Sequence, residues 1–314
     1  MRIVFFGSPA AALPSLESLL GAGHSVELVV TQPDKPAGRG RKLAPSAVKA
    51  FALAHGIPVI EPARIRTDET AFERIRAAGP EVSVVVAYGQ IIPHAVHVFP
   101  LHHSLNVHFS LLPKYRGAAP VQWAILNGDT ESGVTIIELD DRMDEGDILA
   151  RERVAVAPRE TASALEARLA VLGAGLLVST LARIDRVPHH PQDDGAATLA
   201  PKIRKEDGRL SWAETAGAID RKVLALADRP GAFTHFGGKR VNIMRGRPAD
   251  SPGAPSGLAS GPGMILRAGK PGLEVACAAD TVYLIQELQP EGKGVMSAYA
   301  FSLGTKIAPG DSLV

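Results

Sequence analysis

The 314-residue chain is long enough for one large domain or two, and its 46% hydrophobic and 21% charged residues are typical of a folded globular protein. This composition excludes wholesale disorder and fibrous classes. No uninterrupted apolar run approaches the roughly 20 residues that span a bilayer, and the first residues lack the apolar segment of a signal peptide. Cys277 is the only cysteine, which excludes an internal disulfide and a cysteine-rich metal site. We therefore expect a cytoplasmic protein without membrane contact.

The first 190 residues alternate short apolar runs with helical stretches. The predicted strands are Arg2–Gly7, Ser25–Thr31, Pro58–Ile60, Glu81–Tyr88, Leu105–Phe109 and Val134–Leu139. The predicted helices are Pro9–Leu20, Pro45–His55, Thr67–Ala78 (with Thr67 as its N-cap) and Thr161–Ile184. Strands that alternate with helices favour an α/β fold, here a doubly wound, Rossmann-like domain with a mostly parallel sheet over residues 1–189.

The pattern changes after residue 189. Val187–Ala200 is rich in Pro, Asp, Gly and His, which indicates a linker, and we place this linker at residues 190–206. A helix is predicted beyond it over Trp212–Ala227, and Ser251–Gly263 has the composition of a loop. The remaining signals are short strands: Phe233–Phe236 and Val241–Met244 around the turn residues Gly237–Arg240, then Met264–Arg267, Leu273–Cys277 and Thr281–Leu288. Many short strands with turn signals predict a C-terminal OB-like β-barrel domain over residues 207–314.

The strongest chemical signal is Asn106-Val107-His108 at the end of a predicted strand. Residues two apart on a strand point to one face, and the ligand crevice of an open α/β sheet lies at the carboxyl ends of its strands. An amide donor beside an imidazole can hold an oxyanion and move a proton. An asparagine that caps a turn and a histidine satisfied within the core would explain the same residues.

An acidic turn over residues 140–147 follows the predicted strand Val134–Leu139. Its four aspartates and one glutamate could bind a cation, since hard metals prefer carboxylates, or could form a solvated turn. A third interpretation is that Asp144 reaches the imidazole of His108, orients the ring and favours its charged form.

Two segments are locally basic although the net charge of the chain is only +1. Residues 32–51 contain five lysines or arginines and one acid, and residues 202–247 contain 11 and five. The first segment includes the Pro- and Gly-rich loop 33–42, which we expect to be mobile. Its cations could close over an anionic partner or lie free in solvent; they are Lys35, Arg39, Arg41 and Lys42.

Other ligand classes lack their motifs. Gly7-Ser8-Pro9 is not the dinucleotide fingerprint, and the sequence has no Walker A motif and no G-x-S-x-G elbow. Four histidines crowd one segment: His94, His97, His102 and His103. We nevertheless expect no metal site there, and no NAD.

The motifs together resemble a known family. The pattern Asn106-Val107-His108-x-Ser110-Leu111-Leu112-Pro113-x-x-x-Gly117, followed by Asp144-x-Gly146-Asp147, closely resembles the formyltransferases that use 10-formyltetrahydrofolate. The resemblance runs end to end and is strongest to the branch that formylates initiator methionyl-tRNA, because that branch carries the basic loop and a C-terminal barrel. Arg142 and Glu145 stand where the family usually has glycine and threonine, and Phe109 replaces a small residue.

The resemblance implies formyl transfer from folate N10 to the α-amino group of methionine on initiator tRNA, by a monomer with Asn106, His108 and Asp144 as its catalytic residues. The residues implied for folate binding are Val86, Tyr88, Gly89, Ile91, Ser110, Leu111, Leu112, Pro113, Asp140, Asp141 and Met143. Those implied for tRNA binding are the loop cations Lys35, Arg39, Arg41 and Lys42.

In the implied mechanism the neutral amine attacks the formyl carbon, Asn106 and His108 stabilise the oxyanion, and Asp144 helps carry the proton to the leaving N10. Three alternatives stay open at this point. One is the same chemistry on another amine, such as a nucleotide-linked amino sugar. The second is hydrolysis of the same folate to formate. The third is a non-enzymatic nucleic-acid-binding protein built on an OB-like module.

Overall fold

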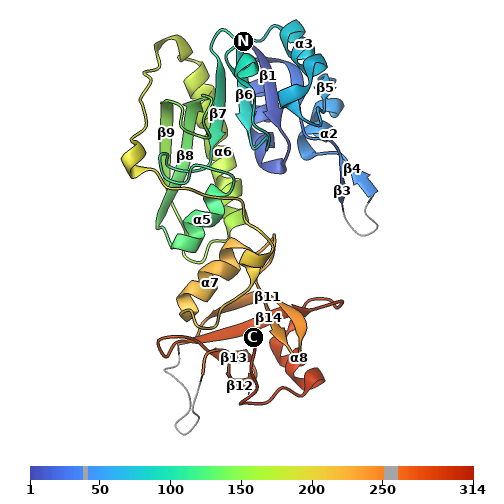
Figure 1. The fold of residues 1–314 in the computed structure, drawn as a ribbon, viewed down its shortest axis with the longest axis vertical. Helices are drawn as coiled ribbons and strands as arrows, with labels where there is room; N and C mark the ends of the chain where they lie inside the picture. The colour runs from blue at the N-terminus through green and yellow to red at the C-terminus, as the bar shows by residue number, and fades with distance from the viewer. Residues whose placement is uncertain (38–41, 251–260) are drawn as a thin grey trace. The chain divides into compact units, whose positions relative to one another are not determined.

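The computed structural model describes residues 1–37, 42–250 and 261–314. These residues form two compact units (Figure 1). The first unit comprises Met1–Pro120, Thr130–Val156 and Leu165–Pro201, and the second comprises Val121–Asp129, Ala157–Ala164 and Lys202–Val314. Each unit is therefore assembled from separate stretches of chain, and the expected linker 190–206 is divided between them.

A seven-stranded mixed sheet forms the centre of the first unit. Its hydrogen-bonded order is β5 (Val59–Ile60), β2 (Ser25–Val30), β1 (Arg2–Gly7), β6 (Val82–Val86), β7 (Ser104–His108), β8 (Glu131–Glu138) and β9 (Ile148–Ala155). The first five strands are parallel, and β8 and β9 extend the sheet in antiparallel fashion. The predicted mostly parallel α/β sheet is confirmed, and all of its predicted strands are present.

The sequence does not predict β9. Its central residues Arg151, Glu152 and Arg153 are charged and exposed, because β9 is the outermost strand of this sheet. A solvated edge strand lacks the regular apolar alternation by which strands are recognised.

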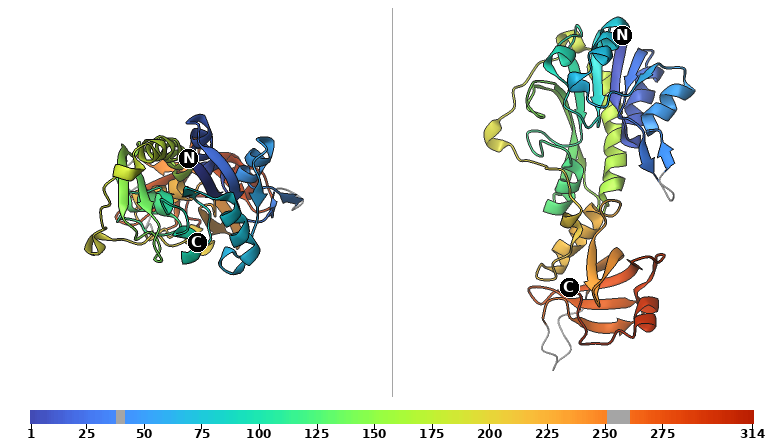
Figure 2. Two further views of the ribbon diagram at one scale, coloured as in Figure 1. Left: turned by 90° about the horizontal axis from the view of Figure 1, so that it is seen from above. Right: turned by 45° about the vertical axis from the view of Figure 1, so that its right-hand side comes forward.

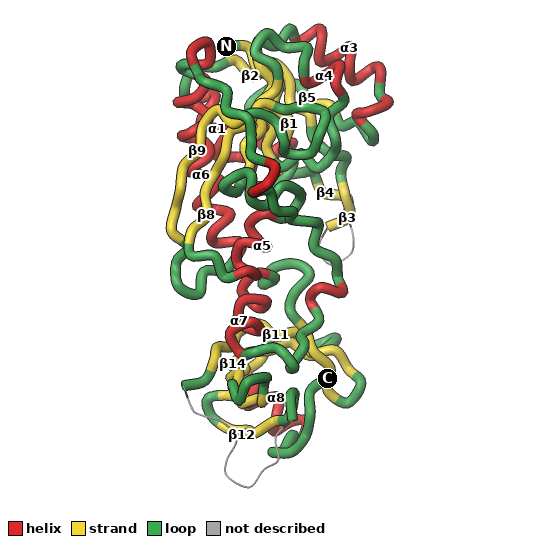
Figure 3. The backbone as a smooth tube through the Cα atoms, turned by 60° about the vertical axis from the view of Figure 1, so that its left-hand side comes forward, coloured by secondary structure: helices red, strands yellow, loops and turns green. Residues whose placement is uncertain are grey.

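Helices α1 (Leu13–Gly21), α2 (Ala47–Ala54), α3 (Glu69–Ala78) and α4 (His94–His97) connect the parallel strands, and α6 (Ala162–Leu181) follows β9 (Figure 3). Short 3-10 turns at Ala10–Ala12 and Ile65–Thr67 precede α1 and α3. The prediction that Thr67 caps α3 is wrong. Asp68 is the N-cap, and its Oδ1 accepts a hydrogen bond from the Ala71 backbone N at 3.0 Å. Thr67 instead ends the preceding 3-10 turn, one residue too early to serve as the cap.

Helix α6 packs closely against the sheet. A Cβ atom at Gly173 of α6 would lie 2.8 Å from a methyl carbon of Val107 on β7, so only a glycine permits this approach. Because side chains alternate along a strand, Asn106 and His108 face the side of β7 opposite to α6. Among the described helices, α6 alone is long and apolar enough to span a membrane by length and composition. Its Leu169 and Leu177 are fully buried, as in the core helix of a folded domain.

The second unit contains a six-stranded antiparallel sheet (Figure 2). The strands pair in the order β10 (Phe233–Phe236), β11 (Lys239–Pro248), β14 (Val282–Pro290), β13 (Gly272–Ala276) and β12 (Ile265–Gly269), and β15 (Met296–Ser297) pairs with β14. The unit also holds α7 (Ala216–Ala225), α8 (Ala298–Thr305) and most of α5 (Pro120–Asn127). The predicted hairpin is confirmed, because β10 and β11 join through Gly237 and Gly238, both with positive φ. Most of the expected loop Ser251–Gly263 lies outside the described residues.

The basic loop of the first unit has a defined base. Strands β3 (Lys35–Ala37) and β4 (Lys42–Ala44) pair in antiparallel fashion. Two paired strands therefore overlap the segment expected to be a mobile loop. Arg39 and Arg41 lie outside the described residues.

A buried carboxylate ties α7 to its surroundings within the second unit. Asp220 is 7% exposed, its Oδ2 accepts a hydrogen bond from Arg159 at 2.7 Å, and its Oδ1 accepts one from the Tyr283 hydroxyl at 3.2 Å. Burial raises the pKa of Asp220, and the Arg159 charge opposes that rise.

We expect Arg159→Met to lower the free energy of unfolding by about 2 kcal/mol, less than for a fully buried pair, because the Arg159 side chain is 45% exposed. Asp220→Asn in the same background should recover part of this loss, since an amide leaves no unpaired charge. The raised pKa means that the folded state holds the Asp220 proton more tightly. Stability of Arg159→Met should therefore fall as pH rises from the ordinary aspartate value near 4. Urea denaturation tests both points, and simple additivity of the two substitutions would contradict the pairing.

Candidate active site

Strand β7 places two polar side chains on one face, at its carboxyl end. His108 is 5% exposed and Asn106 is half-buried, and both lie on the side of the sheet opposite to Val107 and α6. The strand lies between β6 and β8. The structure thus places these two residues together as the strand period predicts.

The acidic turn after β8 brings Asp144 to the same place. Asp144 Oδ1 accepts a hydrogen bond from Asn106 Nδ2 at 3.2 Å, and Oδ2 lies 3.7 Å from His108 Nδ1. The backbone N–H of Gly117 donates to Oδ2 at 2.8 Å. One carboxylate therefore joins both β7 side chains to the loop that follows β7. Of the three interpretations of the acidic turn, this geometry fits the one in which Asp144 reaches His108.

The imidazole of His108 has a contact at each nitrogen. Nε2 lies 3.0 Å from the carbonyl oxygen of Tyr115, and because a carbonyl can only accept, Nε2 carries a proton. Nδ1 is then the ring atom that faces Asp144. Ser110 Oγ donates to the carbonyl oxygen of Lys114 at 2.6 Å, which closes the loop that presents the Tyr115 carbonyl.

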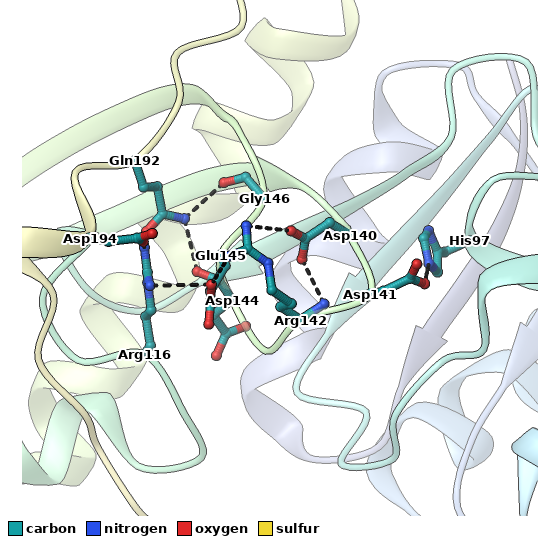
Figure 4. Close-up of polar contacts among 10 residues, drawn as sticks. All are labelled: His97, Arg116, Asp140, Asp141, Arg142, Asp144, Glu145, Gly146, Gln192 and Asp194. Atoms are coloured by element: carbon teal, nitrogen blue, oxygen red, sulfur yellow. Dashed lines mark hydrogen bonds and ion pairs between the residues drawn. The ribbon is translucent and has the colours of Figure 1, made fainter.

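The backbone of Asp144 has a positive φ of 56°, so its turn depends on outside support. Gln192 provides it, because Nε2 donates to the carbonyl oxygens of Asp144 and Gly146, both at 2.8 Å (Figure 4). A side chain at Gly146 would collide with the carbonyl oxygen of Glu138. The turn is therefore held by hydrogen bonds from Gln192, and its close approach to Glu138 requires a glycine at position 146. Sequence reasoning missed Gln192, which lies in the expected linker.

A buried guanidinium holds Gln192. Arg116 is 6% exposed, and its Nε donates to Gln192 Oε1 at 3.1 Å. Its terminal nitrogens lie 2.8 Å from Asp194 and 3.6 Å from Glu145. The hydrogen bond from Arg116 holds the pKa of Asp194 below its usual value. Two carboxylates from separate segments thus compensate a charge that would be costly to bury alone.

The residues implied for folate binding divide by burial. The side chains of Val86, Tyr88, Ser110 and Leu112 are buried in the first unit, and burial raises the pKa of Tyr88. Those with at least partial exposure are Gly89, Leu111, Pro113, Asp140 and Asp141. Two large apolar side chains are mostly in solvent, with Ile91 57% and Met143 59% exposed. Ile91 and Met143 are therefore the large apolar side chains of this set that remain open to contact with a ligand.

The clustered histidines separate into different contacts. His94 Nδ1 and His97 Nε2 lie 3.0 and 3.1 Å from the same oxygen, Oδ1 of Asp141. Hydrogen bonds from His97 and then His94 hold the pKa of Asp141 below its usual value. His103 instead contacts Glu138.

The two basic segments are less positive than their residue counts suggest. Lys49 of the first segment forms ion pairs with Asp34 at 2.8 Å and Glu61 at 2.7 Å, whereas Lys35 is exposed at the base of the β3–β4 hairpin. In the second segment, acids pair with several of the cations: Arg245 with Glu287 at 2.7 Å, and Arg247 with Asp250 at 2.8 Å. Within the first segment, the exposed Lys35 therefore remains a candidate for a phosphate-binding surface.

Comparison with known proteins agrees with this geometry. Residues 1–181 match the family described as formyl transferase, and residues 202–306 match the formyl transferase C-terminal domain. The chain is 42% identical over 315 residues to the methionyl-tRNA formyltransferase of Geotalea uraniireducens and 45% identical over 316 residues to that of Solibacter usitatus. Each match covers 100% of this chain and 98% of the relative.

A similar fold occurs in the N-formyltransferase from Helicobacter canadensis, solved in complex with folinic acid and dTDP-3-aminofucose. Its TM-score is 0.66 at 17% identity, over 92% of this chain and 99% of that one. The full-length matches to both domains and to relatives above 40% identity decide the relationship. This chain belongs to the formyl transferase family.

Proposed function

We propose that this chain transfers the formyl group of 10-formyltetrahydrofolate to the α-amino group of methionine carried by initiator tRNA. The observation that carries the proposal is the meeting of Asn106, His108 and Asp144 at the end of β7. It occurs in a chain 42% and 45% identical over its whole length to two proteins named methionyl-tRNA formyltransferase. We propose a cytoplasmic monomer.

The polar groups suit an oxyanion that forms on the formyl oxygen. The Asn106 amide has two N–H groups, and the bond to Asp144 uses one, so the second can donate to the oxyanion. We assign His108 Nδ1 as the second donor to the oxyanion, and the Tyr115 carbonyl fixes the orientation of the ring.

Proton transfer completes the reaction. The amine attacks in its neutral form, and α-amino groups titrate near pH 8 in model compounds. As the new bond to the formyl carbon forms, the amine nitrogen gains a positive charge and must release a proton. Asp144 takes up this proton, and it passes to folate N10 as the bond between N10 and the formyl carbon breaks. The products are formylmethionyl-tRNA and tetrahydrofolate.

The two substrates would use different surfaces of the first unit. The exposed Ile91 and Met143 offer apolar area to the pterin ring, and the backbone of residues 140–143 offers polar groups to its edge. The hairpin cations Lys35, Arg39, Arg41 and Lys42 suit the phosphates of the tRNA acceptor end.

The test of the proposal is the identity of the amine. We expect formylmethionine after incubation with 10-formyltetrahydrofolate and methionyl-initiator tRNA, and none with elongator methionyl-tRNA, as measured by mass spectrometry of the released amino acid. Formate release without any amine would indicate a hydrolase. Formylation of a nucleotide-linked amino sugar alone would move the substrate to the class seen in the Helicobacter canadensis complex. If the protein neither formylates methionyl-tRNA or an amino sugar nor releases formate, the alternative of a non-enzymatic binding protein would remain.

We expect Asn106→Ala and His108→Ala each to lower kcat by about 10²–10³, because each removes one stabilising donor from the oxyanion. His55→Ala is the matched control, since His55 is exposed and contacts Phe51 of its own helix. Circular dichroism should show all three variants folded. A near-normal rate for His108→Ala would refute the assignment.

Gln192→Ala tests whether the support of the Asp144 turn matters for catalysis. Two hydrogen bonds to that turn are lost, each contributing about 1 kcal/mol, and we expect kcat to fall roughly 10-fold with KM for tRNA little changed. Gln289→Ala is the control, because its side chain donates to the Lys293 carbonyl within the second unit. An equal loss in both variants, or a change in KM alone, would show that Gln192 does not position Asp144.

A further inference from the structure

Three side chains from two segments of the first unit converge on one point. His94 and His97 lie one turn apart on α4, and Asp141 lies in the acidic turn after β8. Their nearest ligand atoms, His94 Nδ1, His97 Nε2 and an Asp141 oxygen, all lie within 4.8 Å of one another. Figure 4 shows Asp141 directed to His97, on the opposite side of the turn from Arg142 and Asp140. We propose that His94, His97 and Asp141 form a binding site for a divalent transition-metal ion of the zinc class.

Two of the three separations between the ligand atoms are close to those of a coordination shell. Zinc binds imidazole nitrogen and carboxylate oxygen at about 2.0–2.2 Å, which places neighbouring ligand atoms of a tetrahedral site about 3.3 Å apart. The two nitrogen–oxygen distances of 3.0 and 3.1 Å are close to that separation. An ion would take the place of the hydrogens between the rings and the carboxylate, and each neutral ring would then carry its proton on its other nitrogen. Binding needs small shifts of the exposed His94 and Asp141 side chains.

The donor set selects the class of ion. Two imidazoles and one carboxylate suit zinc and its first-row neighbours, whereas magnesium and calcium take oxygen ligands. The side chains of His94 and Asp141 are 67% and 66% exposed, so water can fill the remaining positions and the ion can enter from solvent.

The local charges favour a cation. Arg142 is the neighbouring cation in sequence, but its guanidinium pairs with Glu145 at 2.6 Å and lies 3.5 Å from Asp140. Asp141 is left as the carboxylate that faces the two imidazoles. The same geometry would arise if the two histidines only formed hydrogen bonds to Asp141 and bound no metal. Added Zn²⁺ distinguishes the two cases, because it binds only if the three residues form a metal site.

One feature limits the affinity. His97 is 2% exposed, and its Nδ1 has no hydrogen-bond partner among the residues that the structure describes. A histidine that binds a metal through Nε2 carries its proton on Nδ1, and an acceptor for that proton typically adds about 10- to 100-fold to affinity. We therefore expect a reversible site that is weaker than a structural zinc site. This proposal does not depend on the formyl-transfer function.

The experiment is isothermal titration of Zn²⁺ into the full chain, after removal of bound metal by a chelator, for the wild type and three variants. His94→Ala and Asp141→Asn each remove an exposed ligand with little risk to folding. His103→Ala is the matched control, because His103 also contacts a carboxylate, that of Glu138, in the same unit. Thermal unfolding with and without Zn²⁺ gives a second readout, since an ion that binds only the folded state raises Tm.

We expect one equivalent of Zn²⁺ to bind the wild type and His103→Ala equally. Each ligand variant should bind at least about 10-fold more weakly, and its Tm should no longer rise with Zn²⁺. Absence of binding to the wild type would overturn the proposal. Equal binding to all four proteins, or a loss in His103→Ala that matches the loss in the ligand variants, would also overturn it.

Discussion

The carboxylate of Asp144 is the point on which the site depends. It accepts hydrogen bonds from the Asn106 amide and the Gly117 backbone, and it lies 3.7 Å from the His108 ring. Asp144 is 38 positions from Asn106 and 27 from Gly117 in the sequence, and its turn has a left-handed backbone at Asp144 itself. The left-handed region costs free energy for residues other than glycine, although aspartate tolerates it better than most. The turn therefore needs the hydrogen bonds from Gln192.

This arrangement explains how a small set of side chains could act on two substrates. Helix α6 covers the Val107 side of β7, so Asn106 and His108 point to the opposite side. The Tyr115 carbonyl fixes the orientation of the His108 ring, and the Asp144 carboxylate lies 3.7 Å from Nδ1 of that ring. Electrostatic groups that are held before the reaction begins do not have to reorganise during it, and such preorganisation is the main source of rate in oxyanion chemistry.

The sequence predicted what local pattern controls. The period of a strand places Asn106 and His108 on one face, and the apolar runs of the parallel strands mark the sheet. It did not predict β9, whose edge position permits exposed charges. It also did not predict the Gln192–Arg116 contact, which joins residues 76 positions apart, or the convergence of His94 and Asp141 across 47 positions. Contacts of this kind depend on how the chain folds back, which no local periodicity encodes.

Two departures from the family pattern explain each other once the charges are placed. Arg142 and Glu145 form an ion pair at 2.6 Å, and Glu145 also lies 3.6 Å from the buried Arg116. The exposed Arg142 gains little from this pair, since surface ion pairs contribute about 0–1 kcal/mol. The contact with Arg116 is different in kind, because a buried guanidinium needs nearby negative charge. Glu145 thus shares with Asp194 the compensation of the cation that holds Gln192, and Arg142 balances the charge that Glu145 adds to the surface. The pair therefore belongs to the support of the Asp144 turn.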